Sequence, residues 1–275
     1  MSAERSIRDR LLAFELELDR ATCDEVRTTD WGTIFLTPSL PEVWDASWIA
    51  LERPGLAVDE ALALADEALA GFAHRTIVPL GEADGRRLAT ELGRLPGWKA
   101  ERVLYMTWAP DQLRRSSFSG GMPGKGRTPD ASARARETTL AEILPLRRQI
   151  NRELLPPEVA DPDRVAEELI ELDRRYAAVA GDRWFVAPAA GEPAAACKLL
   201  AGDGIRQVED VATLEAQRGR GLAQAIVGAA IDAARAEAPE LIYLTADAED
   251  WPRQMYGKLG FRAIGQLSVL RRDPF

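Results

Sequence analysis

The segment that most constrains the fold is a strand, a glycine-rich turn and an apolar helix, which follow one another between residues 206 and 236. Residues 206–214 (RQVEDVATL) alternate in polarity, which is typical of a strand. Residues 222–236 are apolar on nearly every side, which predicts a buried helix. Between them stands Arg-Gly-Arg-Gly at 218–221, where glycine lets the backbone turn at positive φ and approach a ligand.

This turn also predicts an anion site. Successive backbone N–H groups and a helix N-terminus attract negative charge, and two arginines add positive charge. A P-loop is excluded because no Lys-Ser/Thr pair follows the glycines, and a Rossmann fingerprint is excluded because Gln224 stands in place of its third glycine. A bound pyrophosphate suits the remaining pattern, and the alternative is a tight turn whose arginines face solvent.

Further along the chain, periodicity predicts the order α-α-β-β-β-α-β-α-β for the second half of the protein. The expected helices are 140–154, 163–180, 222–236 and 252–259, and the expected strands are 184–187, 194–200, 206–214, 241–245 and 261–270. In the first half, helices are expected at 11–18, 59–72 (capped by Asp59) and 82–95, and strands at 33–37, 44–51, 75–80 and 99–108. The fold class is therefore α/β (α+β), a mixed central sheet flanked by helices.

Residues 114–134 divide the chain, because they are rich in Ser, Gly and Pro and carry almost no apolar side chain. Such a composition is typical of a linker. The ends of the two halves also resemble each other, as LGRLPGWKAERVLYM (92–106) and YGKLGFRAIGQLSVL (256–270) show. We therefore expect domains at 1–113 and 135–275, related as two copies of one fold and joined by the linker 114–134.

Composition excludes several classes of protein. With 35 Lys+Arg against 44 Asp+Glu, the net charge is −9, which argues against a nucleic-acid-binding protein. Two cysteines are too few and too far apart for a disulfide scaffold or a zinc site, and the single histidine further limits metal and Ser-His chemistry, so no metal site is expected. The histidine, His74, is expected at the surface or at a cap. No apolar run or leader-like segment is present, so we expect no membrane partner and a cytoplasmic location.

Two motifs resemble the GNAT superfamily of CoA-dependent N-acyltransferases. Residues 218–223 (RGRGLA) match its R-x-x-G-x-[GA] signature, and residues 256–261 (YGKLGF) match its Tyr-x-x-x-Gly-Phe pattern. The resemblance covers about 134–270 and implies a GNAT fold there. The first half resembles a degenerate second GNAT-like domain, as in tandem proteins of that superfamily.

The resemblance also implies how acetyl-CoA is held. Its pantetheine arm would pair with the strand at Val211, Ala212 and Thr213. Its pyrophosphate would bind the backbone N–H groups of Arg218, Gly219, Arg220, Gly221, Leu222 and Ala223. Asp250 stands where the family often has an asparagine that contacts the CoA arm, and a carboxylate can accept a hydrogen bond but cannot donate one.

Acetyl transfer requires an amine to lose a proton, and a free alkylamine has a pKa near ~10.4. The leaving thiolate benefits from a proton donor, and Tyr256 matches the general-acid tyrosine of the family, with core packing as the alternative. Glu209 and Asp210 are expected on opposite faces of their strand. Glu209 is the favoured base because it shares a face with Val211 and Thr213, and the alternative is a solvent-facing charge.

The function predicted from these motifs is an N-acetyltransferase that moves an acetyl group from acetyl-CoA to a primary amine of a small molecule or peptide by direct attack. Its partners are the CoA thioester and the amine acceptor. The alternative is a catalytically inactive CoA-binding regulatory or scaffold protein.

Overall fold

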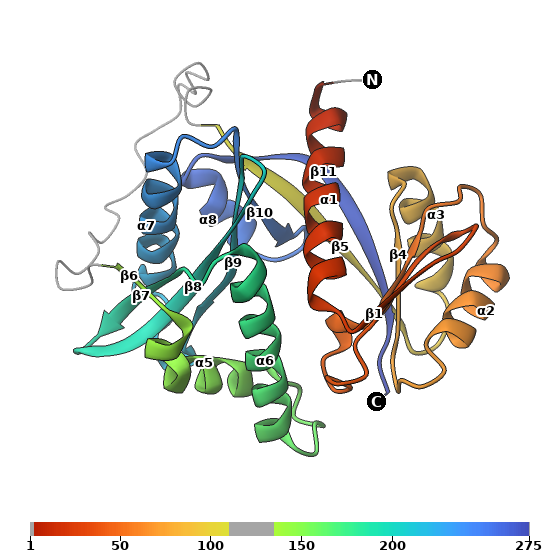
Figure 1. The fold of residues 1–275 in the computed structure, drawn as a ribbon, viewed down its shortest axis with the longest axis horizontal. Helices are drawn as coiled ribbons and strands as arrows, with labels where there is room; N and C mark the ends of the chain where they lie inside the picture. The colour runs from red at the N-terminus through yellow and green to blue at the C-terminus, as the bar shows by residue number, and fades with distance from the viewer. Residues whose placement is uncertain (1–2, 110–134, 275) are drawn as a thin grey trace. The chain divides into compact units, whose positions relative to one another are not determined.

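The computed structural model describes residues 3–109 and 135–274, and it divides the chain into two compact units. The first unit comprises Met1–Tyr105, Thr245–Asp250 and Ala263–Phe275, and the second comprises Met106–Leu244 and Trp251–Arg262. Figure 1 shows the elements of both units, coloured along the chain. Strands β5, β10 and β11 each contribute residues to both units, so a single cut in the chain does not separate them.

The first unit is a mixed sheet with the strand order β1-β2-β3-β4-β11-β5. Its strands are β1 (Glu25–Thr28), β2 (Gly32–Leu36), β3 (Trp48–Leu51), β4 (Arg75–Pro79), β5 (Trp98–Trp108) and the end of β11 (Phe261–Arg272). Its helices are α1 (Ala3–Thr22), α2 (Val58–Ala68) and α3 (Glu82–Leu92). Apolar side chains of α2 and α3, among them Ala65, Leu88 and Leu92, pack on Ile49 and Ile77 of the strands to form its core.

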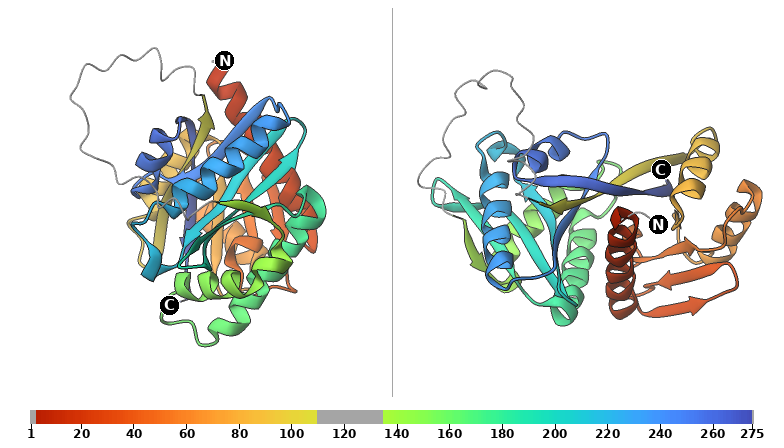
Figure 2. Two further views of the ribbon diagram at one scale, coloured as in Figure 1. Left: turned by 90° about the vertical axis from the view of Figure 1, so that its left-hand side faces the viewer. Right: turned by 90° about the horizontal axis from the view of Figure 1, so that it is seen from above.

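The second unit is built on the strand order β5-β10-β9-β8-β7-β6. Its remaining strands are β6 (Arg136–Thr138), β7 (Trp184–Ala189), β8 (Glu192–Gly202), β9 (Ile205–Thr213) and β10 (Leu241–Asp247), and its helices are α5 (Leu140–Leu154), α6 (Pro162–Ala180), α7 (Leu222–Ala236) and α8 (Pro252–Lys258). Strands β6 to β9 pair antiparallel, whereas β9 and β10 are parallel. Helix α7 lies on one face of these strands and α5 and α6 lie on the other (Figure 2). Strands β8 and β9 and helices α5 and α6 bring a cluster of charged side chains together.

The fold class predicted from the sequence, a mixed sheet flanked by helices, is confirmed, as is the predicted order of helices and strands from α5 to β11. The pattern missed the short strands β1 and β6 and underestimated the length of α1. Residues Trp44–Ala46 form a 3-10 turn rather than a strand, and Asp59 lies inside the first turn of α2, whose N-cap is Ala57. His74 is fully buried rather than at the surface.

The predicted domains 1–113 and 135–275 stay a prediction. The segments Thr245–Asp250 and Ala263–Phe275, which that division assigns to the second domain, belong to the first compact unit. One physical reason is the antiparallel pairing of β11 with β4, which sets Leu270 opposite Ile77. The predicted linker 114–134 lies entirely outside the described residues.

Candidate active site

The turn from Arg218 to Gly221 leads directly into helix α7. Gly219 and Gly221 have φ values of 75° and 80°, the left-handed region that glycine adopts without strain. A Cβ atom added at either glycine would meet nothing within 4 Å, so the backbone conformation and not crowding favours glycine there. The turn is open toward solvent, and a ligand can approach its backbone closely.

The first backbone N–H groups of helix α7 are available as hydrogen-bond donors. Its N-cap residue, Gly221, supplies no side-chain acceptor, and no acidic residue stands in the first turn. The first N–H groups of a helix have no acceptor within the helix, so those of Leu222 and Ala223 can bind an anion. The arginines 218 and 220 are exposed at the same turn, and Nε of Arg218 donates to the carbonyl oxygen of Thr213 at 3.4 Å.

Strand β9 leaves its parallel neighbour partway along its length. Within the described residues it pairs with β10 only over Ile205–Gln207, with Gln207 opposite Tyr243. Beyond that point β9 continues against β8, where Ala212 pairs with Ala196 and Thr213 with Ala195. The half-buried residues Val211, Ala212 and Thr213 therefore lie on a part of β9 that no longer pairs with β10, and an extended ligand could add to such an edge.

A β-bulge interrupts the pairing of β8 and β9. Ala196 pairs with Ala212 but Lys198 pairs with Glu209, so the bulged strand carries an additional residue. Asp210 takes a left-handed φ of 54° at this bulge. The prediction that Glu209 and Asp210 point to opposite faces is wrong, because the extra residue breaks the two-residue period of the strand. Both carboxylates reach Lys198, at 3.7 Å from Glu209 Oε2 and 2.9 Å from Asp210 Oδ2.

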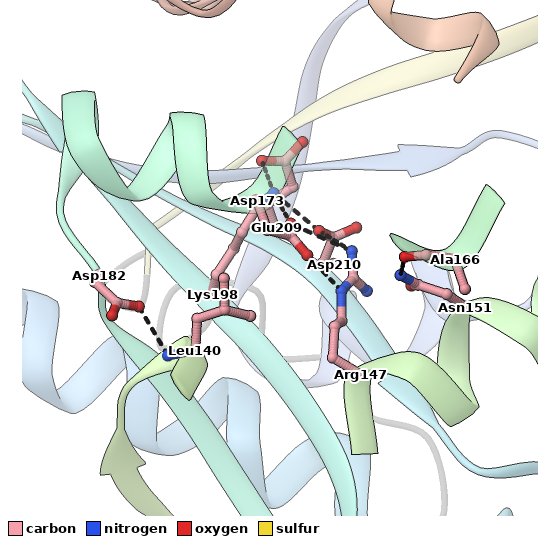
Figure 3. Close-up of polar contacts among 9 residues, drawn as sticks. All are labelled: Leu140, Arg147, Asn151, Ala166, Asp173, Asp182, Lys198, Glu209 and Asp210. Atoms are coloured by element: carbon pink, nitrogen blue, oxygen red, sulfur yellow. Dashed lines mark hydrogen bonds and ion pairs between the residues drawn. The ribbon is translucent and has the colours of Figure 1, made fainter. Parts of the chain in front are cut away.

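Asp210 belongs to a ring of alternating charges, shown in Figure 3. We call Arg147, Asp173, Lys198 and Asp210 the charge ring. Lys198 Nζ lies 3.1 Å from Asp173 Oδ1, and Arg147 contacts Asp173 Oδ2 at 2.7 Å and Asp210 Oδ2 at 2.8 Å. Arg147, Asp173 and Lys198 are each at most 5% exposed. Because each carboxylate contacts both cations, every charge in the ring is compensated, as burial requires.

Aromatic rings enclose the two cations of the charge ring. The Arg147 guanidinium lies 5.3 Å from the centre of the Trp184 ring, and Lys198 Nζ lies 4.6 Å from that of Tyr176. A cation over an aromatic face gains electrostatic attraction while it loses water. The two cations of the charge ring are therefore packed against Trp184 of β7 and Tyr176 of α6.

This environment changes the acidity of its members. Burial alone would lower the pKa of Lys198, but Asp210, Glu209 and Asp173 outweigh that effect and raise its pKa. Burial opposes ionisation of Asp210 as well, yet Arg147 and Lys198 hold the pKa of that carboxyl well below its usual range. Glu209 behaves differently: burial raises its pKa, the attraction of Lys198 only partly opposes this, and Asp210 adds to it.

The remaining predicted residues come from other elements. Tyr256 lies in α8, is 6% exposed, and packs edge-on against Phe261 with ring centres 6.1 Å apart. Asp250 is exposed directly before α8 and belongs to the first unit. The structure brings Glu209 together with Asp210, and Arg218 together with Thr213. The catalytic role of Tyr256 and the CoA contact of Asp250 stay predictions.

Sequence reasoning missed three members of the charge ring, Arg147, Asp173 and Lys198. A signal was present for Lys198, since it interrupts the apolar run AAACKLL of a central strand, where a charge needs a partner. Asp173 likewise falls on the buried side of α6. No comparable signal marks Arg147, because the same helix also carries Arg148, which is half-buried, and Arg152, which is exposed.

Two kinds of feature are absent from the residues that the structure describes. None of the helices there combines the length and apolar character that crossing a bilayer demands. Residues 3–109 and 135–274 contain no group of three or more His, Cys, Asp or Glu side chains arranged to hold a metal ion.

Comparison with known proteins adds the family. Residues 147–261 match the model described as "Acetyltransferase (GNAT) family". No curated protein matches the chain. Among solved structures, a functionally unknown conserved protein from Staphylococcus epidermidis aligns over 90% of this chain and 94% of its own, with 13% identity and a TM-score of 0.63.

Two further structures carry the family in their descriptions. A GCN5-related N-acetyltransferase from Kribbella flavida aligns over 100% of this chain and 97% of its own, with 20% identity and a TM-score of 0.59. A tandem GNAT protein from the clavulanic acid biosynthesis pathway covers 89% of this chain and 78% of its own, with 12% identity and a TM-score of 0.51. At such identities the likeness concerns the fold. The family model and these folds confirm the resemblance found in the motifs, and the chain carries a GNAT-family acetyltransferase domain over residues 147–261.

Proposed function

We propose that this protein is an acetyl-CoA-dependent N-acetyltransferase whose acceptor is a primary amine of a small molecule or peptide. The observation that carries the proposal is the exposed turn at Gly219 and Gly221, which opens onto the first N–H groups of α7 beside the unpaired edge of β9. The acyltransferase family supports the donor, and the location we propose is the cytoplasm.

In this proposal the donor binds along β9 and the turn. The pyrophosphate of acetyl-CoA binds the backbone N–H groups of residues 218–223. Its pantetheine arm pairs with the strand edge at Val211–Thr213. The cradle has room for a phosphate, since the space where Cβ atoms would stand at Gly219 and Gly221 is empty.

The chemistry is a direct attack. The amine nitrogen forms a bond to the thioester carbonyl carbon, the C–S bond breaks, and the sulfur leaves as a thiolate. Glu209 takes the proton that the amine loses, and Tyr256 gives a proton to the departing thiolate. The raised pKa of Glu209 favours this role, because a carboxylate with greater proton affinity is a better base near neutral pH.

The test combines binding with turnover. Isothermal titration with CoA measures the donor site, and an assay of acetyl-CoA consumption over amino acids, polyamines, aminoglycosides and peptides measures transfer. We expect CoA binding and turnover with at least one amine class. Binding without turnover on any amine would favour a CoA-binding regulatory protein instead, and absence of both would overturn the proposal.

A paired variant assigns the base. Glu209→Gln should reduce kcat by about 10²–10⁴-fold, the usual contribution of a general base, while the affinity for CoA stays unchanged. Glu215→Gln, an exposed glutamate in the next turn of the chain, serves as the matched control. Equal turnover of the wild type and Glu209→Gln would remove Glu209 from the mechanism.

A further inference from the structure

Glu209 is a third carboxylate that lies beside the charge ring without being a member of it. The ring itself holds two cations and two carboxylates, and each carboxylate contacts both cations at 2.7–3.1 Å. Glu209 stands outside this arrangement, with its Oε2 atom 3.7 Å from Lys198 Nζ, beyond hydrogen-bonding distance. When Glu209 is ionised, the group of five side chains therefore carries one uncompensated negative charge.

The two oxygens of Glu209 differ in their surroundings. Oε2 is buried and has no hydrogen-bond partner among the described residues. The side chain as a whole nevertheless remains 34% exposed. A buried oxygen without a donor weakens the ionised form, while the exposed part of the side chain allows a proton to arrive. Lys198, the cation in contact range of that buried oxygen, therefore affects how strongly the ionised form is held.

Lys198 acts on Glu209 by two routes. Directly, its ammonium group is the cation in contact range of Glu209 Oε2. Indirectly, it shares with Arg147 the carboxylate of Asp210, the residue that takes the left-handed φ of 54° at the bulge. That bulge is what turns both neighbouring carboxylates toward the same ammonium group.

We propose that Lys198 is a positioning residue for the transfer reaction, which fixes Asp210 in the bulge and sets the proton affinity of Glu209. The proposal rests on the proposed function of Glu209 as proton acceptor. The charged groups that face Glu209 are Lys198 from β8, Asp210 from β9, Asp173 from α6 and Arg147 from α5. The two cations favour its ionised form and the two aspartates oppose it.

Two substitutions that should shift the pKa of Glu209 in opposite directions test this balance. Lys198→Met removes the cation in contact range, so the pKa of Glu209 should rise by about 1–3 units. Asp210→Asn removes a like charge, so the pKa of Glu209 should fall, by up to a similar amount. Asparagine tolerates the left-handed backbone, so the second variant preserves the bulge. The opposite directions are the signature, because general loss of structure would move both variants the same way.

The pKa is read directly from carbon-13 NMR of protein labelled at the glutamate side-chain carboxyl carbon, with the signal assigned by its loss in Glu209→Gln. The acid limb of the kcat/KM profile for a responsive amine should follow the same shifts. Matched controls are Lys99→Met and Asp232→Asn, whose side chains are 67% and 78% exposed and lie outside the charge ring. Neither control should move the signal.

The outcomes separate this inference from the proposed function. Opposite NMR shifts support the role of Lys198 even if no amine is acetylated, in which case only the proposed function fails. If Lys198→Met does not fold, as its melting curve would show, Lys198→Gln, which also removes the ammonium group but stays polar, replaces it and should likewise raise the pKa of Glu209. An unchanged Glu209 signal in a folded variant, or a shift in the same direction in both, overturns the inference whatever the turnover.

Discussion

Arg147 Nη2 lies 2.8 Å from Asp210 Oδ2, and this contact joins helix α5 to the bulged part of strand β9. The arginine also contacts Asp173 on α6, so one side chain connects three elements of the second unit. Its pKa is raised, because the charges of Asp210 and Asp173 outweigh the burial that would lower it. Arg147 therefore stays ionised, and its removal would leave two carboxylates sharing Lys198 alone.

Arg147→Met should thus destabilise the fold by about 3–5 kcal/mol, the usual cost of leaving buried charges without their partner. Its chain neighbour provides the control, since Arg148 pairs with Glu167 at the surface and both side chains are at least 35% exposed. Arg148→Met should change stability by at most ~1 kcal/mol. Urea denaturation of both variants measures the difference, and similar losses would show that the charge ring contributes nothing special.

The left-handed glycine before α7 gives a second prediction. Gly221→Ala introduces a side chain at φ 80°, a conformation that costs an L-residue roughly 1–2 kcal/mol. Because the added Cβ meets no atom within 4 Å, the backbone of the turn is free to shift and relieve this strain. Such a shift would also move the backbone N–H groups that form the anion site. We expect weaker CoA binding by isothermal titration, by about tenfold for each 1.4 kcal/mol of lost affinity.

The control for that variant is Gly228→Ala in the interior of the same helix. Gly228 also meets nothing within 4 Å, and alanine favours a helix by roughly 0.5–1 kcal/mol over glycine, so this change should raise stability without altering CoA affinity. Equal CoA affinity in both variants would argue against the turn as the phosphate site.

Tyr256 invites a substitution that keeps its ring. Tyr256→Phe should preserve the edge-on packing against Phe261 and remove only the hydroxyl. If the phenol protonates the thiolate, kcat should fall by about 10²–10⁴-fold with little change in CoA affinity. Tyr243→Phe makes the same chemical change at a buried tyrosine of β10 and should leave kcat close to that of the wild type. Full turnover by the Tyr256→Phe enzyme would exclude Tyr256 as the general acid and would leave core packing as its role.

Stability should depend on pH through His74, the single histidine of the chain. Burial lowers its pKa in the folded state, its Nε2 atom lies 2.9 Å from the carbonyl oxygen of Ser47, and Nδ1 is buried with no hydrogen-bond partner among the described residues. The unfolded chain therefore binds a proton more readily than the folded one. The stabilisation is complete above the unfolded pKa of about 6.5 and is lost as pH falls from there toward the lower folded value.

The measurement is the free energy of unfolding in urea at pH 7.5 and at about pH 5.5, below the unfolded pKa of ~6.5. His74→Gln has no titrating group and should show a smaller loss between the two pH values than the wild type. The comparison isolates His74 from the carboxylates, which titrate alike in both proteins. An equal loss in both would assign the pH dependence to other groups.

Much of the second unit could be predicted because its elements are signalled locally. The apolar helix at 222–236, the strand at 241–245 and the glycines of the turn each carry their pattern within a few residues. The stripe assigned to α6 shows the limit of that approach. Val165, Leu169, Leu172, Tyr176 and Val179 recur at helical spacing, yet Val179 is 46% exposed and the buried side includes Asp173 at 3%.

The charge ring could not be predicted, because its members come from four elements. Lys198 interrupts an apolar strand and so signals that it needs a partner, but nothing in the sequence says which residues those partners are. Only the register of β8 on β9 brings Lys198 opposite Glu209, and the bulge that admits Asp210 leaves no mark in the alternation of 206–214. Pairing between strands far apart in the sequence limits the prediction of the first unit in the same way. Nothing near Ile77 indicates that Leu270 will lie beside it.

That pairing of β4 with β11 also governs when the molecule can be completed during its synthesis. Domains usually fold in order as the ribosome delivers them, N-terminal first. Here the first compact unit needs the segment Ala263–Phe275, which emerges after the whole acetyltransferase domain at 147–261. The nascent first unit must therefore wait with the edge of β4 unfilled, exposed to pairing with the wrong partner, until that last strand arrives.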